Sequence, residues 1–188
     1  MIKLEKKISA EFCFCSDLPM PDRCLFEAAI NARAKSQAPY SHYKVGASVL
    51  TYHEGAGKIF SGCNVERVSF TQTTHAEQNA IDTMVAKLGT KKILKVCVVG
   101  RPDSCDTDTC EGRFIFAPKD RHISEFSLIL EQVPVPCGHC LQIIWENCMG
   151  DPSVKLMSVT SDGIVAITTI GDAFPMRFGP KDLGVEYK

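Results

Sequence analysis

The segment that most restricts the fold of this chain is an almost unbroken apolar run, L-K-V-C-V-V-G, at residues 94–100. A strand with one solvated face alternates apolar and polar residues, whereas a continuous apolar run is typical of a strand buried on both faces. A sheet that contains such a strand needs packing layers above and below it. We therefore expect an α/β fold with a central sheet between helices.

Other segments supply the rest of this architecture. Apolar residues at helical spacing predict helices at residues 22–37, 76–88 and 140–149. Apolar stretches bounded by turn residues predict further strands at residues 45–52, 58–66, 154–160 and 164–170. Asp22 is expected to cap the first helix. The order helix, two strands, helix, strand, helix, two strands predicts a three-layer α/β/α sandwich around a mixed five-stranded sheet.

Length and charge narrow the class of protein. With 188 residues the chain can form one domain with a substantial core. Its 21 basic and 22 acidic residues give a net charge of −1, so no overall field attracts nucleic acid or a membrane. The chain lacks a signal-peptide pattern at its start and any apolar run of about 18 residues. We expect a cytoplasmic protein whose ten cysteines stay reduced.

Two short segments, each at the start of a predicted helix, carry candidate catalytic chemistry. In T-H-A-E, at residues 74–77, Thr74 and Glu77 fit a capping box, which would make Glu77 a structural residue. In P-C-G-H-C, Cys137 and Cys140 lie three residues apart, so one helical turn can direct both sulfurs to one point. A redox pair or two buried thiols are the alternatives for these cysteines.

Together the two segments predict a catalytic zinc site. His75, Cys137 and Cys140 are ligands of the tetrahedral zinc type and leave one position open for water. Two thiolates neutralise Zn²⁺, and the N-terminal ends of two helices favour those thiolates. Glu77 would lie beside the metal with its carboxylate available for proton transfer.

These segments resemble the signature of the zinc deaminases, H-x-E followed by P-C-x-x-C. Three more stretches resemble the cytidine deaminase family, namely P-Y-S-H-Y-K-V-G-A at 39–47, G-C-N-V-E at 62–66 and R-F-G-P-K-D-L at 177–183. The resemblance covers about residues 22–101 and 134–183. On this basis we expect a single domain over residues 1–188, with an N-terminal extension at about 1–21 and an insertion at about 102–133.

The resemblance implies hydrolytic deamination of cytidine and deoxycytidine to uridine and deoxyuridine, with release of ammonia. A zinc-activated hydroxide would attack C4, and Glu77 would shuttle protons. One zinc ion per subunit, a place in pyrimidine salvage and a homodimer or homotetramer are also implied, with no nucleic-acid or membrane partner. Substrate contacts are implied for six residues: Tyr43, Val45, Asn64, Glu66, Ala76 and Phe178.

The expected roles of these residues differ. Asn64 and Glu66 would hydrogen-bond the ribose hydroxyls, and the Glu66 carboxylate would also repel a 5′ phosphate. Tyr43 and Val45 would line the wall beside the pyrimidine, or else belong to the strand core. In tetrameric relatives the residue equivalent to Phe178 reaches into a neighbouring subunit's site, and core packing is the alternative here.

The sequence also departs from the family pattern. Many small members have Cys and Arg where this chain has His75 and Gln78. In those members the Arg offsets the negative charge of a third thiolate. This chain has a neutral His as the third ligand, so it needs no such Arg. Leu141 replaces the Arg that usually follows the second Cys. The insertion could be a lid, a specificity loop or an oligomer contact, and His122 within it has no identified partner.

Four more cysteines, Cys13, Cys15, Cys105 and Cys110, raise the alternative of a second metal. Thiols in surface loops are the favoured interpretation.

Three other functions compete with this one. A polynucleotide deaminase would need basic grooves and exposed stacking aromatics, which the sequence does not indicate. A deaminase of a modified cytosine nucleoside is consistent with an insertion that reshapes the pocket. A non-catalytic zinc-binding module would be expected to have lost its proton shuttle, whereas Glu77 is intact.

Overall fold

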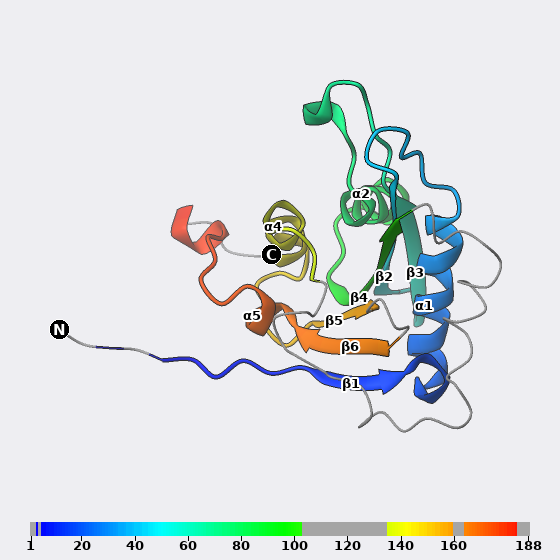
Figure 1. Cartoon of the computed structure of the whole chain (residues 1–188). Coiled ribbons are helices and arrows are strands. Elements are labelled where there is room, and N and C mark those ends of the chain that lie inside the picture. The colour runs from blue at the N-terminus through cyan, green and yellow to red at the C-terminus, as the bar shows by residue number, and fades with distance from the viewer. Residues whose placement is uncertain (1–2, 4, 103–134, 160–163, 184–188) are drawn as a thin grey trace.

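The computed structural model of the chain describes residues 3, 5–102, 135–159 and 164–183 (Figure 1). Apart from Pro102, the predicted insertion with Cys105, Cys110 and His122 lies outside the described residues. Among the described residues, no helix is long and apolar enough to cross a membrane.

The described residues form one mixed sheet with the strand order β1-β6-β5-β4-β2-β3. Its strands are β1 (Glu11–Phe14), β2 (Tyr43–His53), β3 (Ala56–Cys63), β4 (Ile93–Pro102), β5 (Lys155–Val159) and β6 (Ile164–Thr169). The pair β4 and β5 is parallel, and the other four pairs are antiparallel. Because a parallel pair needs a crossover, the chain passes through α4 between β4 and β5.

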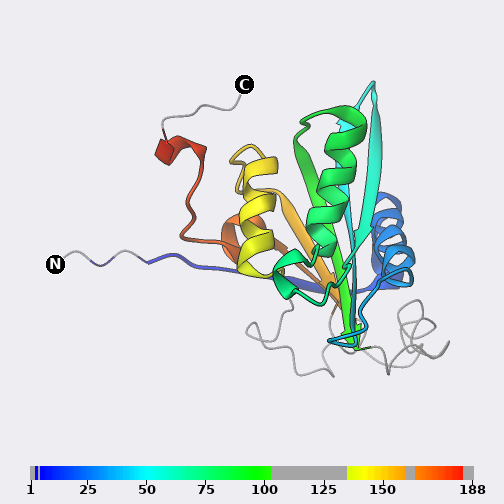
Figure 2. The same cartoon turned by 90° about the horizontal axis from the view of Figure 1, so that it is seen from above.

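Helices cover both faces of this sheet, as predicted. The main helices are α1 (Met20–Arg33), α2 (Ala76–Leu88) and α4 (Gly138–Asn147), and shorter elements are α5 (Ile170–Ala173), η1 (Cys15–Asp17), η2 (Phe70–Gln72) and η6 (Pro180–Leu183). Figure 2 shows α1 on one face and α2 with α4 on the other. The prediction of a sheet between helical layers is confirmed.

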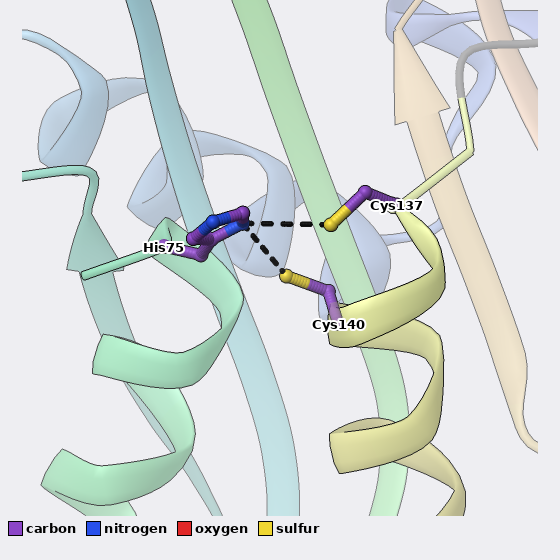
Figure 3. Close-up of side chains that lie close together, drawn as sticks. All are labelled: His75, Cys137 and Cys140. Carbon is purple, nitrogen blue, oxygen red and sulfur yellow. Dashed lines mark hydrogen bonds between the residues drawn. The ribbon is translucent and has the colours of Figure 1, made fainter. Parts of the chain in front are cut away.

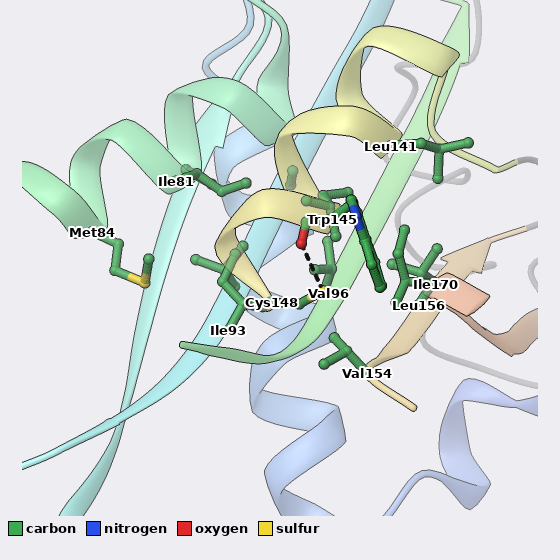
Figure 4. Packing of buried hydrophobic residues seen from close by; sticks show 14 of the residues in the cluster. Ile81, Met84, Ile93, Val96, Leu141, Trp145, Cys148, Val154, Leu156 and Ile170 are labelled. Carbon is green, nitrogen blue, oxygen red and sulfur yellow. Dashed lines mark hydrogen bonds between the residues drawn. The ribbon is translucent and has the colours of Figure 1, made fainter. Parts of the chain in front are cut away.

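Each face has its own apolar core, and β4 contributes to both. Val96 packs with α2 and α4, whereas Cys97 and Val99 pack with α1. Figure 4 shows the first cluster, where Leu156 of β5 lies beside Trp145 of α4. Full burial of an aliphatic side chain of this size contributes about 1.5–3 kcal/mol. The apolar run that suggested a doubly buried strand is therefore the centre of two cores.

The sheet has six strands in the described part of the chain, not five. The additional strand, β1, comes from the predicted N-terminal extension and pairs with β6, with Glu11 opposite Ile167. The hydroxyl of Thr168 donates to the carbonyl of Ser9 at 2.7 Å and continues this attachment. A four-residue strand without clear alternation gives little sequence signal, which is why the prediction missed it.

The prediction that Asp22 caps the first helix is wrong. Helix α1 begins two residues earlier, at Met20 after Pro19, and places Pro21 in its first turn. The Asp22 side chain is buried and pairs with the ammonium group of Lys95 on β4. Asp22 thus joins the helix to the sheet instead of capping it.

Two glycines allow the helices to approach the sheet closely. A Cβ atom on Gly46 of β2 would lie 2.0 Å from the carbonyl oxygen of Ala29 in α1. A Cβ atom on Gly62 of β3 would lie 2.4 Å from the backbone nitrogen of Ala80 in α2. Because Gly62 has no side chain, α2 can lie directly against the end of β3, next to the candidate site.

Candidate active site

The two predicted ligand segments meet at the beginnings of α2 and α4 (Figure 3). His75 is the N-cap residue of α2, Cys137 is the N-cap residue of α4, and Cys140 lies in the first turn of α4. His75 Nδ1 lies 3.5 Å from Cys137 Sγ and 3.4 Å from Cys140 Sγ. All three ligand atoms lie within 4.8 Å of one another.

This donor set fits a zinc ion. With Zn–S bonds of about 2.3 Å and Zn–N bonds of about 2.0–2.1 Å, tetrahedral geometry places N and S about 3.5 Å apart. The two N-to-S distances therefore agree with a shared ion. Burial raises the pKa of the Cys140 thiol well above its usual range, with further contributions from Glu77 and Cys137. A divalent cation would oppose that effect and stabilise the thiolate.

Glu77 lies beside these ligands but outside the group that could hold the metal. Its side chain is 5% exposed, lines the same cavity and is one of the groups that raise the pKa of Cys140. The capping-box interpretation is wrong because the N-cap is His75, whose side chain caps nothing. Thr74 instead exchanges backbone hydrogen bonds with Val65, at 2.9 and 3.1 Å.

A cavity of about 480 Å³ opens beside the three ligands. Five of the six predicted substrate residues line it, namely Tyr43, Val45, Asn64, Glu66 and Ala76. The prediction missed several lining residues: Ser41, Phe70, Thr73, Val98, Gly100 and Val135. Most of these are apolar or carry small hydroxyls, so no sequence pattern distinguishes them from core or loop residues.

Asn64 occupies a buried position just after β3, and its amide is held by three groups. Its Oδ1 accepts from the Val45 backbone N–H at 2.8 Å and from the Ser36 hydroxyl. Its Nδ2 donates to the Tyr43 carbonyl oxygen at 2.9 Å. Both lone pairs of the oxygen are used, which leaves one amide N–H to face the cavity.

Glu66 is anchored to the segment that follows α1. Its Oε2 accepts from the backbone N–H groups of Tyr40 and Ser41, at 2.9 and 3.1 Å, and its Oε1 accepts from the Ser41 hydroxyl. Burial alone would raise the pKa of Glu66, but the hydrogen bonds outweigh it and the pKa is lowered. Glu66 is therefore ionised at neutral pH and presents a remaining lone pair.

Tyr43 forms part of the cavity wall at the start of β2. Its ring lies so close to Gly100 of β4 that a Cβ atom there would be 2.9 Å from Tyr43 Cε1. The side chain is 43% exposed and so is not plain strand core. The absence of a side chain at Gly100 provides the space that the ring occupies.

Known proteins give an independent comparison. Residues 20–154 match the family model described as the cytidine and deoxycytidylate deaminase zinc-binding region. This match spans more than half of the chain and includes His75, Glu77, Cys137 and Cys140. The chain belongs to this deaminase family.

Relatives within the deaminase family extend over most of the chain. A cytidine deaminase of Sporosarcina psychrophila is 31% identical over 153 residues, covering 81% of this chain and 87% of that protein. A cytidine deaminase of Halalkalibacterium halodurans is 27% identical over 164 residues, covering 87% and 98%. The crystal structure of cytidine deaminase from Burkholderia pseudomallei matches with a TM-score of 0.57 and 31% identity, covering 82% and 97%.

Two residues singled out by comparison with the deaminase family lie outside the cavity lining. Leu141, which replaces the usual Arg, is 6% exposed and packs in the core with Ile144 and Trp145. Phe178 is 57% exposed, so it is not a core residue of this chain. Its carbonyl oxygen accepts from Gln142 Nε2 at 3.0 Å, which holds it against α4.

Arg177 strengthens the same attachment of the C-terminal segment. Its guanidinium carbon lies 4.0 Å from the ring centroid of Trp145, a cation–π contact. As a result, the segment around Phe178 has a defined position on the outer side of α4.

Within the described ranges, no other group of three candidate ligands is close enough to hold a metal. Cys13 and Cys15 lie at the end of β1 and the start of η1. Burial, with Asp17 nearby, raises the pKa of Cys13 to about 11. Because no third candidate ligand lies close to this pair in the described residues, the structure gives no support for a second metal there.

Proposed function

We propose that this chain is a zinc-dependent cytidine deaminase that converts cytidine and water to uridine and ammonia. One observation carries the proposal. The buried carboxylate of Glu77 shares a nucleoside-sized cavity with the His75, Cys137 and Cys140 ligand set. Membership of the deaminase family and the names of the relatives support this assignment.

The three ligands would hold one zinc ion per chain. When bound, zinc supplies the Lewis acidity that makes a water molecule nucleophilic at neutral pH. The protein holds the ligands in place through two helix starts, whose positive dipole ends offset the negative charge of the thiolates.

Glu77 is the group that moves protons. Its carboxylate accepts a proton from the attacking water and delivers it to ring N3, which makes C4 more electrophilic. After attack at C4, the same carboxylate takes the proton of the new C4 hydroxyl and transfers it to the 4-amino group, which leaves as ammonia while the C4 carbonyl forms. The Glu77 side chain is buried beside the cavity, with 5% of its surface exposed, so little of the carboxylate is open to bulk water.

Asn64 and Glu66 together offer the substrate one donor and one acceptor. The remaining amide N–H of Asn64 can donate to a hydroxyl that in turn donates to Glu66. This pair satisfies one sugar hydroxyl, so loss of another hydroxyl should be tolerated. We therefore propose deoxycytidine as a second substrate, with deoxyuridine as its product. The negative charge of Glu66 disfavours a 5′ phosphate nearby.

We further propose that the enzyme is cytoplasmic and forms a homodimer or homotetramer. Exposed apolar side chains support a contact with a second copy beside α4. Met176, Phe178 and Leu183 are 90%, 57% and 69% exposed.

A substrate panel tests the proposed function. Zinc-loaded protein is incubated with cytidine, deoxycytidine, cytidine monophosphate and adenosine, and ammonia release is followed with the absorbance change. We expect rapid turnover of the first two and little of the others. Inactivity on all four, with zinc bound, would overturn the assignment in favour of a modified nucleoside or a binding role.

A further inference from the structure

Two serine hydroxyls hold the side chains of Asn64 and Glu66, which form the part of the cavity that we propose binds the sugar and call the sugar-facing wall. Ser36 Oγ donates to Asn64 Oδ1, and Ser41 Oγ donates to Glu66 Oε1. Both serines belong to the segment between α1 and β2, which contributes no metal ligand. The wall therefore depends on a part of the chain that is separate from the zinc centre.

The contact of Ser36 fixes the direction of the Asn64 amide. Val45 N–H occupies one lone pair of Oδ1 at 2.8 Å, and Ser36 supplies the second donor. With both lone pairs used, the oxygen is turned away from the ligand and the nitrogen faces the cavity. Without the hydroxyl of Ser36, one lone pair of the amide oxygen would be left without its protein donor.

The contact of Ser41 fixes the direction of the Glu66 carboxylate. Two backbone N–H groups hold Oε2, whereas the Ser41 hydroxyl is the partner of Oε1. Oε1 is also the oxygen with a lone pair left for a ligand. Rotation of the carboxylate about its last bond is therefore limited by a backbone clamp on one oxygen and a hydroxyl on the other.

We infer that Ser36 and Ser41 are positioning residues that pre-orient Asn64 and Glu66 to receive a sugar hydroxyl. This inference rests on the proposed function, because it takes the bound ligand to be a nucleoside. Neither serine belongs to the group that could hold the metal, and their partners are Asn64 and Glu66, so we expect them to act on binding and not on the chemical step. Loss of either hydroxyl should raise KM while kcat stays nearly constant.

The test compares four variants of the zinc-loaded full chain, namely Ser36→Ala, Ser41→Ala, Ser41→Thr and Ser48→Ala. The matched control is Ser48, a buried serine of β2 whose hydroxyl donates to the Leu25 carbonyl oxygen at 2.6 Å, away from the cavity. Its loss removes a buried hydrogen bond without touching the sugar-facing wall. KM and kcat are measured with cytidine, 2′-deoxycytidine and 3′-deoxycytidine, alongside thermal unfolding.

We expect Ser36→Ala and Ser41→Ala each to raise KM for cytidine about 5- to 30-fold, as expected for the loss of one ordering hydrogen bond. The value of kcat should stay within about twofold, and Ser41→Thr should recover most of the loss. One of the two deoxy analogues should bind wild-type protein poorly, and the alanine variants should discriminate against it less than wild type does. Ser48→Ala should leave KM unchanged.

Two results would overturn the inference. One is a wild-type KM in both alanine variants, and the other is an equal KM rise in Ser48→Ala, which would indicate general loosening. Failure of the proposed function is distinguishable, because wild-type protein would then turn over no cytidine at all.

Discussion

His75 and Cys137 occupy equivalent positions on two helices, since each is the N-cap residue, and Nδ1 of the histidine lies 3.5 Å from Sγ of the cysteine. Neither side chain caps its own helix, so both are available for a shared cation. The positive ends of two helix dipoles meet at this point and stabilise thiolates. The fold thus brings together two segments separated by 62 positions.

Removal of any one ligand should release the metal. We expect His75→Ala, Cys137→Ser and Cys140→Ser each to reduce zinc from about one ion per chain to a small fraction, because two remaining ligands bind weakly. The zinc content of each variant is measured after gel filtration in a buffer that contains a weak chelator. Cys24→Ser, at an exposed cysteine outside the site, is the control and should keep its zinc. Full zinc retention in a ligand variant would contradict the assignment.

The close contact at Gly62 should be needed for both stability and metal binding. In Gly62→Ala the new Cβ atom would lie 2.4 Å from the backbone nitrogen of Ala80 and 2.7 Å from Asn79. Because backbone cannot yield as a side chain can, we expect a loss of about 1–3 kcal/mol in the free energy of unfolding. Displacement of α2 also moves His75, so zinc affinity should fall. Denaturant unfolding and a zinc titration measure the two effects.

Gly57→Ala on the same strand is the matched control for Gly62. Its Cβ atom would meet the flexible end of Leu50, at 3.3 Å. We expect near wild-type stability and zinc affinity for this variant. Similar losses in both variants would mean that the approach of α2 to β3 is not the cause.

Asp151 should make part of the stability depend on acid pH. Its carboxylate lies 2.8 Å from Lys92 Nζ and accepts from the Ser153 N–H and hydroxyl, and these contacts lower its pKa from 3.8 to about 2. A lowered folded-state pKa stabilises the fold above the unfolded value, so this contribution is lost as pH falls from about 4 to about 2.

The variant Asp151→Asn tests this pH dependence. The pair is partly exposed, so we expect a loss of about 1 kcal/mol or less at pH 7. The difference between wild type and variant should shrink toward zero near pH 2. Urea unfolding at several pH values measures it, and a difference that stays constant down to pH 2 would contradict the assigned pKa.

The parts of this protein that the sequence revealed are those with strong local signals. The apolar run of β4 indicated a doubly covered sheet, and the ligand types of His75, Cys137 and Cys140 indicated zinc. Both signals are properties of side chains at fixed spacing. By contrast, β1 has four residues and gains its stability from pairing with β6, which no local pattern reveals.

The details of the cavity wall depended on tertiary contacts in the same way. The resemblance to the cytidine deaminase family indicated Asn64 and Glu66, but nothing in the sequence indicated the serines that donate to them. Those hydrogen bonds join positions 28 and 25 residues apart, after the chain has folded. The role of Asp22 was misjudged for a similar reason, because its partner Lys95 lies on a distant strand.

The most direct test of the account measures Glu77→Gln in a preparation whose zinc content is determined alongside its cytidine turnover. This variant keeps the size of the buried side chain but cannot accept a proton. We predict wild-type zinc content and thermal stability. We also predict that kcat falls by about 10²- to 10⁴-fold, the usual contribution of general acid–base catalysis. A kcat within about tenfold of wild type, with zinc in place, would contradict the assignment of Glu77 as the group that moves protons.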